Sequence, residues 1–136
     1  MSGAVAAANP KLPTHAGVKM TTRATIQAYF DRLKQHANWQ SLFADGLIYT
    51  QYTSPVKRLE GKAAFLDGTR RFYSSVVSLE VRDVLVDGAR ACVTTHYQLQ
   101  RPAGPAIESD VAELFEVHDG KISTFSIYFD TAPFPK

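Results

Sequence analysis

The chain has 136 residues, 45% hydrophobic and 11% aromatic, which suits one globular domain that buries roughly two-thirds of its unfolded surface. The formal net charge is only +2 and the adjacent basic pairs, Lys57-Arg58 and Arg70-Arg71, are isolated, so no nucleic acid partner is expected. The single cysteine, Cys92, rules out an internal disulfide and suits a reducing compartment, so we expect a cytoplasmic protein.

Residues 1–20 are expected to form a flexible tail that precedes a single domain at residues 21–136. The segment MSGAVAAANPKLPTHAGVK lacks a basic beginning, and its longest apolar run, AVAAA, is too short for a signal peptide or a membrane span. No membrane partner is therefore expected. Met20 directly precedes a helix signal and is an alternative start of the protein.

The first half of the domain is predicted to be mainly helical. Thr21 and Thr22 are good N-caps for a helix with apolar residues at helical spacing, and Asn38 can cap a second, short helix. A strand follows and ends before Pro55, whereas Gly68 weakens the prediction of a third helix. The predicted elements are helices at residues 23–36, 39–44 and 61–73 and a strand at residues 47–53.

The second half alternates apolar and polar residues with the period of two that is typical of strands. The segments DG, RPAGPA and HDG separate the alternating runs, and Asp-Gly turns between such runs are strong hairpin signals, so three successive hairpins are predicted. Helices first and a long meander second indicate an α+β domain, with the helices packed on one face of an antiparallel sheet. The predicted strands are residues 76–86, 89–100, 107–117 and 121–129.

One carboxylate stands out within the strand at residues 107–117. Val111, Glu113, Phe115 and Val117 share one face of that strand, and this face is the more continuously apolar of the two. Burial there penalises the anion, so we expect Glu113 to be neutral at neutral pH and to donate a hydrogen bond. The alternative is a structural glutamate that shares its proton with Thr95, the residue expected opposite it.

The order of elements, together with NWQSLFADGLIY, VDGARACV and FEVHDGKISTFSIYFD, resembles the SnoaL-like, ketosteroid-isomerase-like branch of the NTF2-like superfamily. The resemblance covers residues 22–131. It implies a cone-shaped curved sheet wrapped around about three N-terminal helices, a deep pocket between them and a homodimer. Only three residues separate Trp39 from Phe43, about one turn fewer than the family suggests, so a reshaped pocket mouth is expected.

Neither well-defined chemistry of this superfamily is matched. The resemblance places the general base of the steroid isomerases at Gln51 and their tyrosine donor at Phe30, neither of which can do that work, and their second, acidic donor at Glu113. The polar set of the superfamily's epoxide hydrolases is also missing. Its positions hold Thr95, Tyr97 and Ile127.

Several other residues are expected to face a ligand. Tyr49 and Gln51 share a strand face and offer neutral hydrogen-bonding groups, although ordinary polar filling of the cone explains them equally well. Trp39 can cover the pocket mouth or serve as a packing anchor, and Asp130 should point outward or cap the C-terminal turn. The predicted ligand-binding residues are Tyr49, Gln51, Tyr97, Trp39, Phe30, Phe115, Ile127 and Phe129.

Two hypotheses for function follow. The first is a pocket protein for a small, largely apolar carbonyl-type molecule, with acid/base chemistry of the isomerase, cyclase or dehydratase kind in which Glu113 is catalytic. The second is a non-catalytic ligand-binding or dimerisation module, which the absence of a convincing base favours. The histidines show no paired spacing, so no metal site and no cofactor are indicated.

A homodimer is expected to form through the convex face of the sheet. Side chains on that face are mixed in character and include no lysine, which would suit a self-complementary contact between uncharged surfaces. The residues assigned to it are Cys92, Thr94, His96, Gln98, Ser126 and Tyr128.

Overall fold

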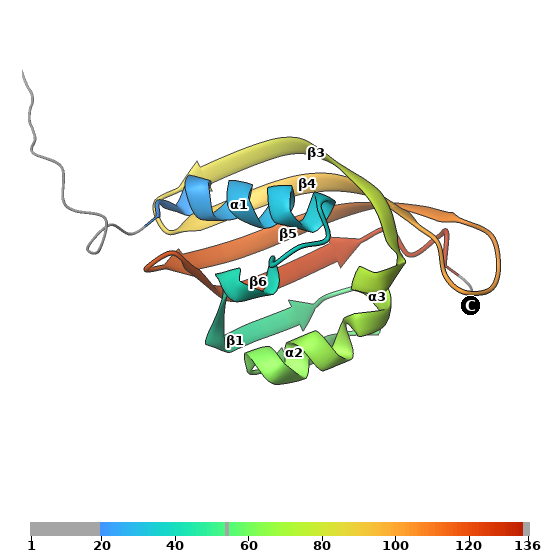
Figure 1. Ribbon diagram of the computed structural model, residues 1–136, viewed down its shortest axis with the longest axis horizontal. Coiled ribbons are helices and arrows are strands. Elements are labelled where there is room, and N and C mark those ends of the chain that lie inside the picture. The colour runs from blue at the N-terminus through green and yellow to red at the C-terminus, as the bar shows by residue number, and fades with distance from the viewer. Residues whose placement is uncertain (1–19, 54, 135–136) are drawn as a thin grey trace, which may run out of the picture.

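The structure is a computed structural model that describes residues 20–53 and 55–134. Most of the predicted N-terminal tail, residues 1–19, therefore lies outside the described residues. Three helices and a six-stranded curved sheet that does not close on itself make up an α+β fold (Figure 1), as predicted. None of the helices in the described ranges is long and apolar enough to cross a membrane.

Helix α1, Thr22–Lys34, begins where the threonine caps predict. The Thr21 hydroxyl accepts a hydrogen bond from the Ala24 N–H at 3.0 Å, which satisfies one of the unpaired donors of the first turn. One face of the helix is buried, including Ile26, Tyr29 and Leu33. The second predicted helix is shorter than expected: η2 is a single 3₁₀ turn, Gln40–Leu42.

The sheet has the strand order β2-β1-β6-β5-β4-β3. The three predicted hairpins are present, but β1 runs parallel to β6, so the sheet is mixed and the expectation of a wholly antiparallel sheet is corrected. The edge strand β2 was not predicted, because its four residues are mostly charged and show no clear alternation. The strands are β1 Phe43–Gln51, β2 Lys57–Glu60, β3 Val76–Asp87, β4 Arg90–Leu99, β5 Ile107–His118 and β6 Lys121–Phe129.

The third predicted helix is divided into α2, Lys62–Gly68, and α3, Arg70–Ser75. The break falls at Thr69, whose φ of −108° and ψ of 8° depart from helical geometry. Gly68 lies against β2, because a Cβ atom at this position would come within 2.6 Å of a terminal methyl carbon of Leu59. The break turns the chain so that α3 leads directly into β3 (Figure 1).

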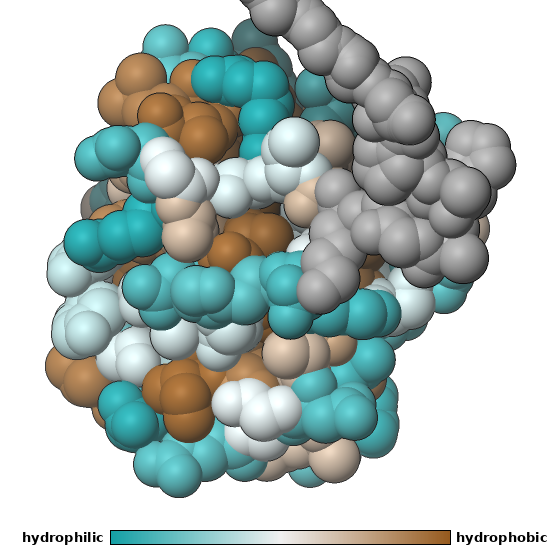
Figure 2. All heavy atoms as spheres, turned by 90° about the vertical axis from the view of Figure 1, so that its left-hand side faces the viewer, coloured by the Kyte–Doolittle hydropathy of each residue, from teal (hydrophilic) through white to brown (hydrophobic). Residues whose placement is uncertain are grey.

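The core lies between α1 and the concave face of the sheet (Figure 1). Alternate residues of β4 and β5 are buried, which confirms the face assigned to Glu113. Tyr29 is fully buried at the centre of an aromatic cluster. At the end of the molecule that holds the β3–β4 and β5–β6 turns, polar and apolar patches alternate on the surface in view (Figure 2).

The convex face differs from the uncharged surface that was expected. The ring of His96 lies between the carboxylates of Glu108 and Asp110, with each ring nitrogen 2.7 Å from an oxygen. Arg82 also pairs with Asp110, at 3.0 Å. Near these charges, Tyr128 is 46% exposed and stacks on Tyr52. The face is therefore a mixture of charged groups and exposed aromatic rings.

Candidate functional site

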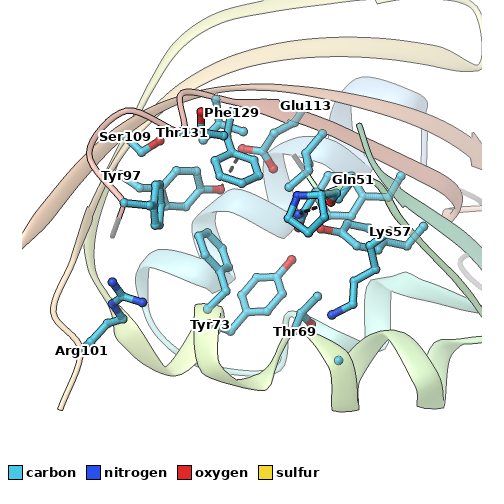
Figure 3. A pocket seen from close by; sticks show the side chains of 18 residues that line it. Gln51, Lys57, Thr69, Tyr73, Tyr97, Arg101, Ser109, Glu113, Phe129 and Thr131 are labelled. Carbon is cyan, nitrogen blue, oxygen red and sulfur yellow. Dashed lines mark hydrogen bonds between the residues drawn. The ribbon is translucent and has the colours of Figure 1, made fainter. Parts of the chain in front are cut away.

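A cavity of about 620 Å³ lies between the concave face of the sheet and the segment formed by α2 and α3. Strands β1, β4, β5 and β6 contribute its inner walls (Figure 3). Its polar lining residues are Tyr49, Gln51, Lys57, Thr69, Tyr73, Tyr97, Arg101, Ser109, Glu113 and Thr131. Its larger apolar lining residues are Phe72, Val111, Phe125, Ile127, Phe129 and Phe134.

Glu113 is held by two hydroxyl groups from β4. The Thr95 hydroxyl donates to Glu113 Oε2 at 2.7 Å, and the Tyr97 hydroxyl donates to the same oxygen at 2.8 Å. Thr95 is not directly opposite, because Val93 is the cross-strand partner of Glu113, so the contact is diagonal. The other carboxyl oxygen, Oε1, has no hydrogen-bond partner among the described residues, and the carboxyl group points into the cavity (Figure 3).

Burial raises the pKa of Glu113 from its ordinary value of 4.5 to about 7. The side chain is only 1% exposed, and loss of hydration penalises the anion more than the two hydroxyl donors stabilise it. The neutral and ionised forms are therefore both well populated near pH 7. In the ionised form both hydroxyls donate to Oε2, and in the neutral form the acidic proton can reside on Oε1.

A second pair of hydroxyl groups joins α1 to α3. The hydroxyl oxygens of Tyr29 and Tyr73 are 2.7 Å apart. Tyr29 is 0% exposed, and among the described residues the Tyr73 hydroxyl is the one hydrogen-bond partner of the Tyr29 hydroxyl. The buried Tyr29 O–H group is therefore paired only if it donates to the Tyr73 oxygen. Tyr73 lines the cavity and keeps its own proton for a ligand (Figure 3).

Tyr49 supplies another available donor. It lines the cavity, and its hydroxyl has no hydrogen-bond partner within the described ranges. Burial raises the pKa values of Tyr49 and Tyr73 well above the ordinary value of 10, so both remain protonated. The cavity thus combines one titrating acid with two neutral donors.

Six of the nine predicted site residues line the cavity: Tyr49, Gln51, Tyr97, Glu113, Ile127 and Phe129. Phe30, Phe115 and Trp39 lie in the core, and none of them belongs to the cavity lining. Phe30 and Phe115 pack against Tyr29, and the Trp39 ring stacks on Tyr73 with centroids 4.0 Å apart. Trp39 is therefore a packing anchor behind the cavity wall rather than a cover for its mouth.

Sequence reasoning missed Tyr73, Lys57 and Arg101 as lining residues. Tyr73 follows Phe72 in the third predicted helix, where the spacing of apolar residues does not single it out. Lys57 belongs to the unpredicted β2, and Arg101 lies in the β4–β5 connection. No signal in the sequence placed these cations on the same cavity.

Gln51 is the last residue of β1, and its side-chain amide donates to the Pro55 carbonyl at 3.2 Å. Asp130 does not line the cavity and instead caps the C-terminal turn, where its carboxylate accepts from the Ala132 N–H at 3.0 Å. Among the described lining residues Glu113 is the one acid. No group of three or more His, Cys, Asp or Glu side chains in the described ranges is arranged to hold a metal ion.

Residues 26–125 match the model of the SnoaL-like domain. The chain belongs to the SnoaL-like family. This assignment confirms the predicted NTF2-like relationship, and it agrees with the three helices and curved sheet of the structure. A comparison with curated proteins gives no match.

Solved structures with the same fold come from functionally different relatives. A candidate ketosteroid isomerase from Kribbella flavida is 26% identical, with a TM-score of 0.66 over 87% of this chain and 85% of that one. An LEH-like epoxide hydrolase from M. tuberculosis is 21% identical, with a TM-score of 0.69 over 82% and 84%. The epoxide hydrolase/cyclase-like enzyme SalBIII is 14% identical, with a TM-score of 0.72 over 82% and 92%. At these identities the SalBIII and M. tuberculosis comparisons establish the fold alone.

Proposed function

We propose that the protein is an enzyme that moves a proton on a small, largely apolar carbonyl compound, in an isomerisation or cyclisation. The observation that carries this proposal is Glu113, a buried acid with a pKa of about 7 and one carboxyl oxygen directed into the cavity. A general acid/base is most effective when its pKa lies near the working pH. Relatives described as isomerases and cyclase-like enzymes support the same class of chemistry.

The donors in the cavity suit stabilisation of an enolate. A ligand carbonyl oxygen that accepts from the Tyr73 hydroxyl would carry increased negative charge as its α-carbon loses a proton. Tyr29 donates to Tyr73 from behind and so strengthens the donation of Tyr73 to the ligand. Tyr49 can donate to the same oxygen or to a second polar group of the ligand.

The proton transfers balance with Glu113 alone. Ionised Glu113 Oε1 removes a proton from the carbon next to the carbonyl, and the C–H electron pair moves into the enolate. Neutral Glu113 then returns the proton to another carbon of the conjugated system, which completes an isomerisation. In a cyclisation the enolate carbon attacks a second carbonyl carbon, and Glu113 gives its proton to the new alkoxide. Throughout, Thr95 and Tyr97 hold Oε2 in place.

The second candidate function is non-catalytic binding of the same kind of ligand. It is favoured by Gln51, an amide at the place where the steroid isomerases are expected to hold their base, and by the two hydroxyl donors that stabilise Glu113 within the sheet. A buried acid with such partners can serve structure alone. The two candidates differ in one measurable property, which is whether the protein accelerates proton exchange at carbon.

The test uses 2-tetralone, an apolar bicyclic ketone whose α-protons exchange with D₂O and can be followed by NMR. We expect the wild-type protein to accelerate this exchange and Glu113→Gln to reduce the acceleration by about a hundredfold or more. Glu116→Gln is the matched control, because Glu116 lies on the same strand and does not line the cavity. Binding of 2-tetralone without faster exchange, or full exchange by Glu113→Gln, would reject the catalytic proposal.

A further inference from the structure

Two cations line the same cavity as the buried acid. Lys57 lies on the edge strand β2, and Arg101 lies in the β4–β5 connection, so the two side chains reach the cavity from different parts of the sheet and lie on opposite sides of it (Figure 3). Lys57 is exposed and Arg101 is half-buried. Neither side chain makes an ion pair or a hydrogen bond to any described residue. Both charges are therefore available to a ligand.

Other arginines near the site are already used. Arg58, next to Lys57, pairs with Glu60 at 3.1 Å, and Arg70 pairs with Asp67 at 3.1 Å. The two cavity-lining cations are thus distinguished from their neighbours by the absence of an internal partner among the described residues. Since Glu113 is the one acid of the described lining, the cavity carries a net positive charge in either protonation state of Glu113.

The register of the sheet relates Lys57 to Glu113. Lys57 pairs with Gln51, Gln51 with Ile127 and Ile127 with Glu113, so these residues form one row across four strands. Three interstrand spacings of about 4.8 Å place the two ends of the row roughly 14 Å apart along the sheet, and the curvature of the sheet shortens the direct path. A bicyclic molecule can therefore approach Glu113 at one end and a cation at the other.

Arg101 lies on the opposite side of the cavity from Lys57 (Figure 3). It follows β4 by two residues, beyond the pair formed by Tyr97 and Ser109. Tyr97 reaches back along the strand to Glu113, whereas Arg101 lies on the side away from it. A guanidinium group offers two parallel N–H donors that match a carboxylate, and a partly buried position strengthens such a contact.

We propose that the ligand of this cavity is a carboxylate-bearing carbonyl compound, whose carboxylate binds Arg101 while its carbonyl group meets Glu113 and Tyr73, and that Lys57 adds to the positive charge that attracts it. The proposal rests on the proposed function of the same site and names its class of substrate. The apolar walls between the two ends accommodate the hydrocarbon body of the molecule. The two cations also attract an anionic ligand from solution, an effect that salt weakens.

The test compares two probes of nearly the same shape, the anionic 6-carboxy-2-tetralone and the neutral 6-carbamoyl-2-tetralone. Calorimetric titration at low salt is expected to show the carboxylate binding about tenfold or more tightly, which is about 1.4 kcal/mol. Arg101→Gln should reduce this preference several-fold, Lys57→Gln should reduce it less, and high salt should reduce it in the wild type. Arg71→Gln and Lys62→Gln are the matched controls, because neither residue lines the cavity.

Equal affinity for the two probes, or a preference for the carboxylate that survives both Arg101→Gln and Lys57→Gln, would overturn the proposal. Glu113→Gln should retain the preference, because Glu113 is not the group that binds the carboxylate. Proton exchange of the two ketones is measured in the same samples. If the protein accelerates proton exchange but binds both probes equally, only the proposal of a carboxylate-bearing ligand is rejected. If it prefers the carboxylate probe but does not accelerate exchange, only the catalytic function is rejected.

Discussion

Replacing Glu113 by glutamine isolates the energetic cost of a titrating carboxyl group in the core. The amide has nearly the same shape, its oxygen can still accept from Thr95 and Tyr97, and it does not titrate. Because the folded protein binds the Glu113 proton more tightly than the unfolded chain does, stability should fall as pH rises. Below pH 4.5 both states are protonated, between 4.5 and about 7 only the unfolded chain loses the proton, and above that range both are ionised.

The size of this effect follows from the two pKa values. The difference between 4.5 and about 7 corresponds to roughly 3 kcal/mol at 1.36 kcal/mol per pKa unit. Between about pH 5 and about pH 8 the free energy of unfolding of the wild type should therefore fall by about 2.5 kcal/mol relative to that of Glu113→Gln. Urea denaturation of both proteins at several pH values measures this difference. The contributions of the other titrating groups are common to both proteins and cancel.

Two comparisons make the stability experiment decisive. Glu116→Gln, on the outer face of the same strand, is the control for loss of a carboxyl group outside the core. Parallel curves for the wild type and Glu113→Gln would refute the reasoning, because they would mean that Glu113 titrates alike in the folded and unfolded states. NMR titration of the Glu113 carboxyl provides a direct check, since a pKa near 4.5 in the folded protein would refute it as well.

Three further predictions concern other residues. Tyr73→Phe should slow 2-tetralone exchange by about tenfold or more in the NMR assay, whereas Tyr29→Phe, which removes only the supporting donor, should slow it less; equal rates for the wild type and Tyr73→Phe would contradict the donor role. The carboxylates of Asp110 and Glu108 raise the pKa of His96 above 6.5, so the midpoint of its NMR titration should move down in Asp110→Asn. The stabilisation from this contact should be lost as the pH rises through the wild-type midpoint. An unchanged midpoint in Asp110→Asn would argue against the contact. We also propose a homodimer through the convex face, for which light scattering should give twice the chain mass and Tyr128→Glu should give a single-chain mass; a monomeric wild type would contradict it.

Periodicity predicted the elements that pack regularly and missed those that depend on tertiary contacts. The four long strands and helix α1 were predictable because alternation and helical spacing report which face is buried. The parallel contact between β1 and β6 joins segments that are distant in the chain, and no local pattern encodes it. The break at Thr69 likewise reflects how α2 packs on β2 and α3 leads into β3.

The residues of the candidate site likewise include some that the sequence pattern could identify and some that it could not. Glu113 could be identified because a carboxylate interrupts an apolar strand face, and its hydroxyl partners share the neighbouring strand. Tyr73 and Arg101 could not, because a tyrosine at a helix end and an arginine in a loop are common and carry no spacing signal. Their position at the cavity depends on how α3 and the β4–β5 connection approach the sheet in three dimensions.

The cost of Glu113 is itself an argument about why the residue is there. Globular domains are stable by only about 5–15 kcal/mol, so roughly 3 kcal/mol lost to one ionisable group is a substantial fraction. Packing alone does not require a carboxyl group, since apolar side chains can often replace buried charged groups without loss of stability. Such a replacement would have to include Thr95 and Tyr97, because both direct their hydroxyls at Oε2 and would be left unpaired if Glu113 alone became apolar. Glu113 has one oxygen fixed by two donors and the other facing a cavity, and its pKa lies near neutral pH. Proton transfer explains such an acid better than packing does.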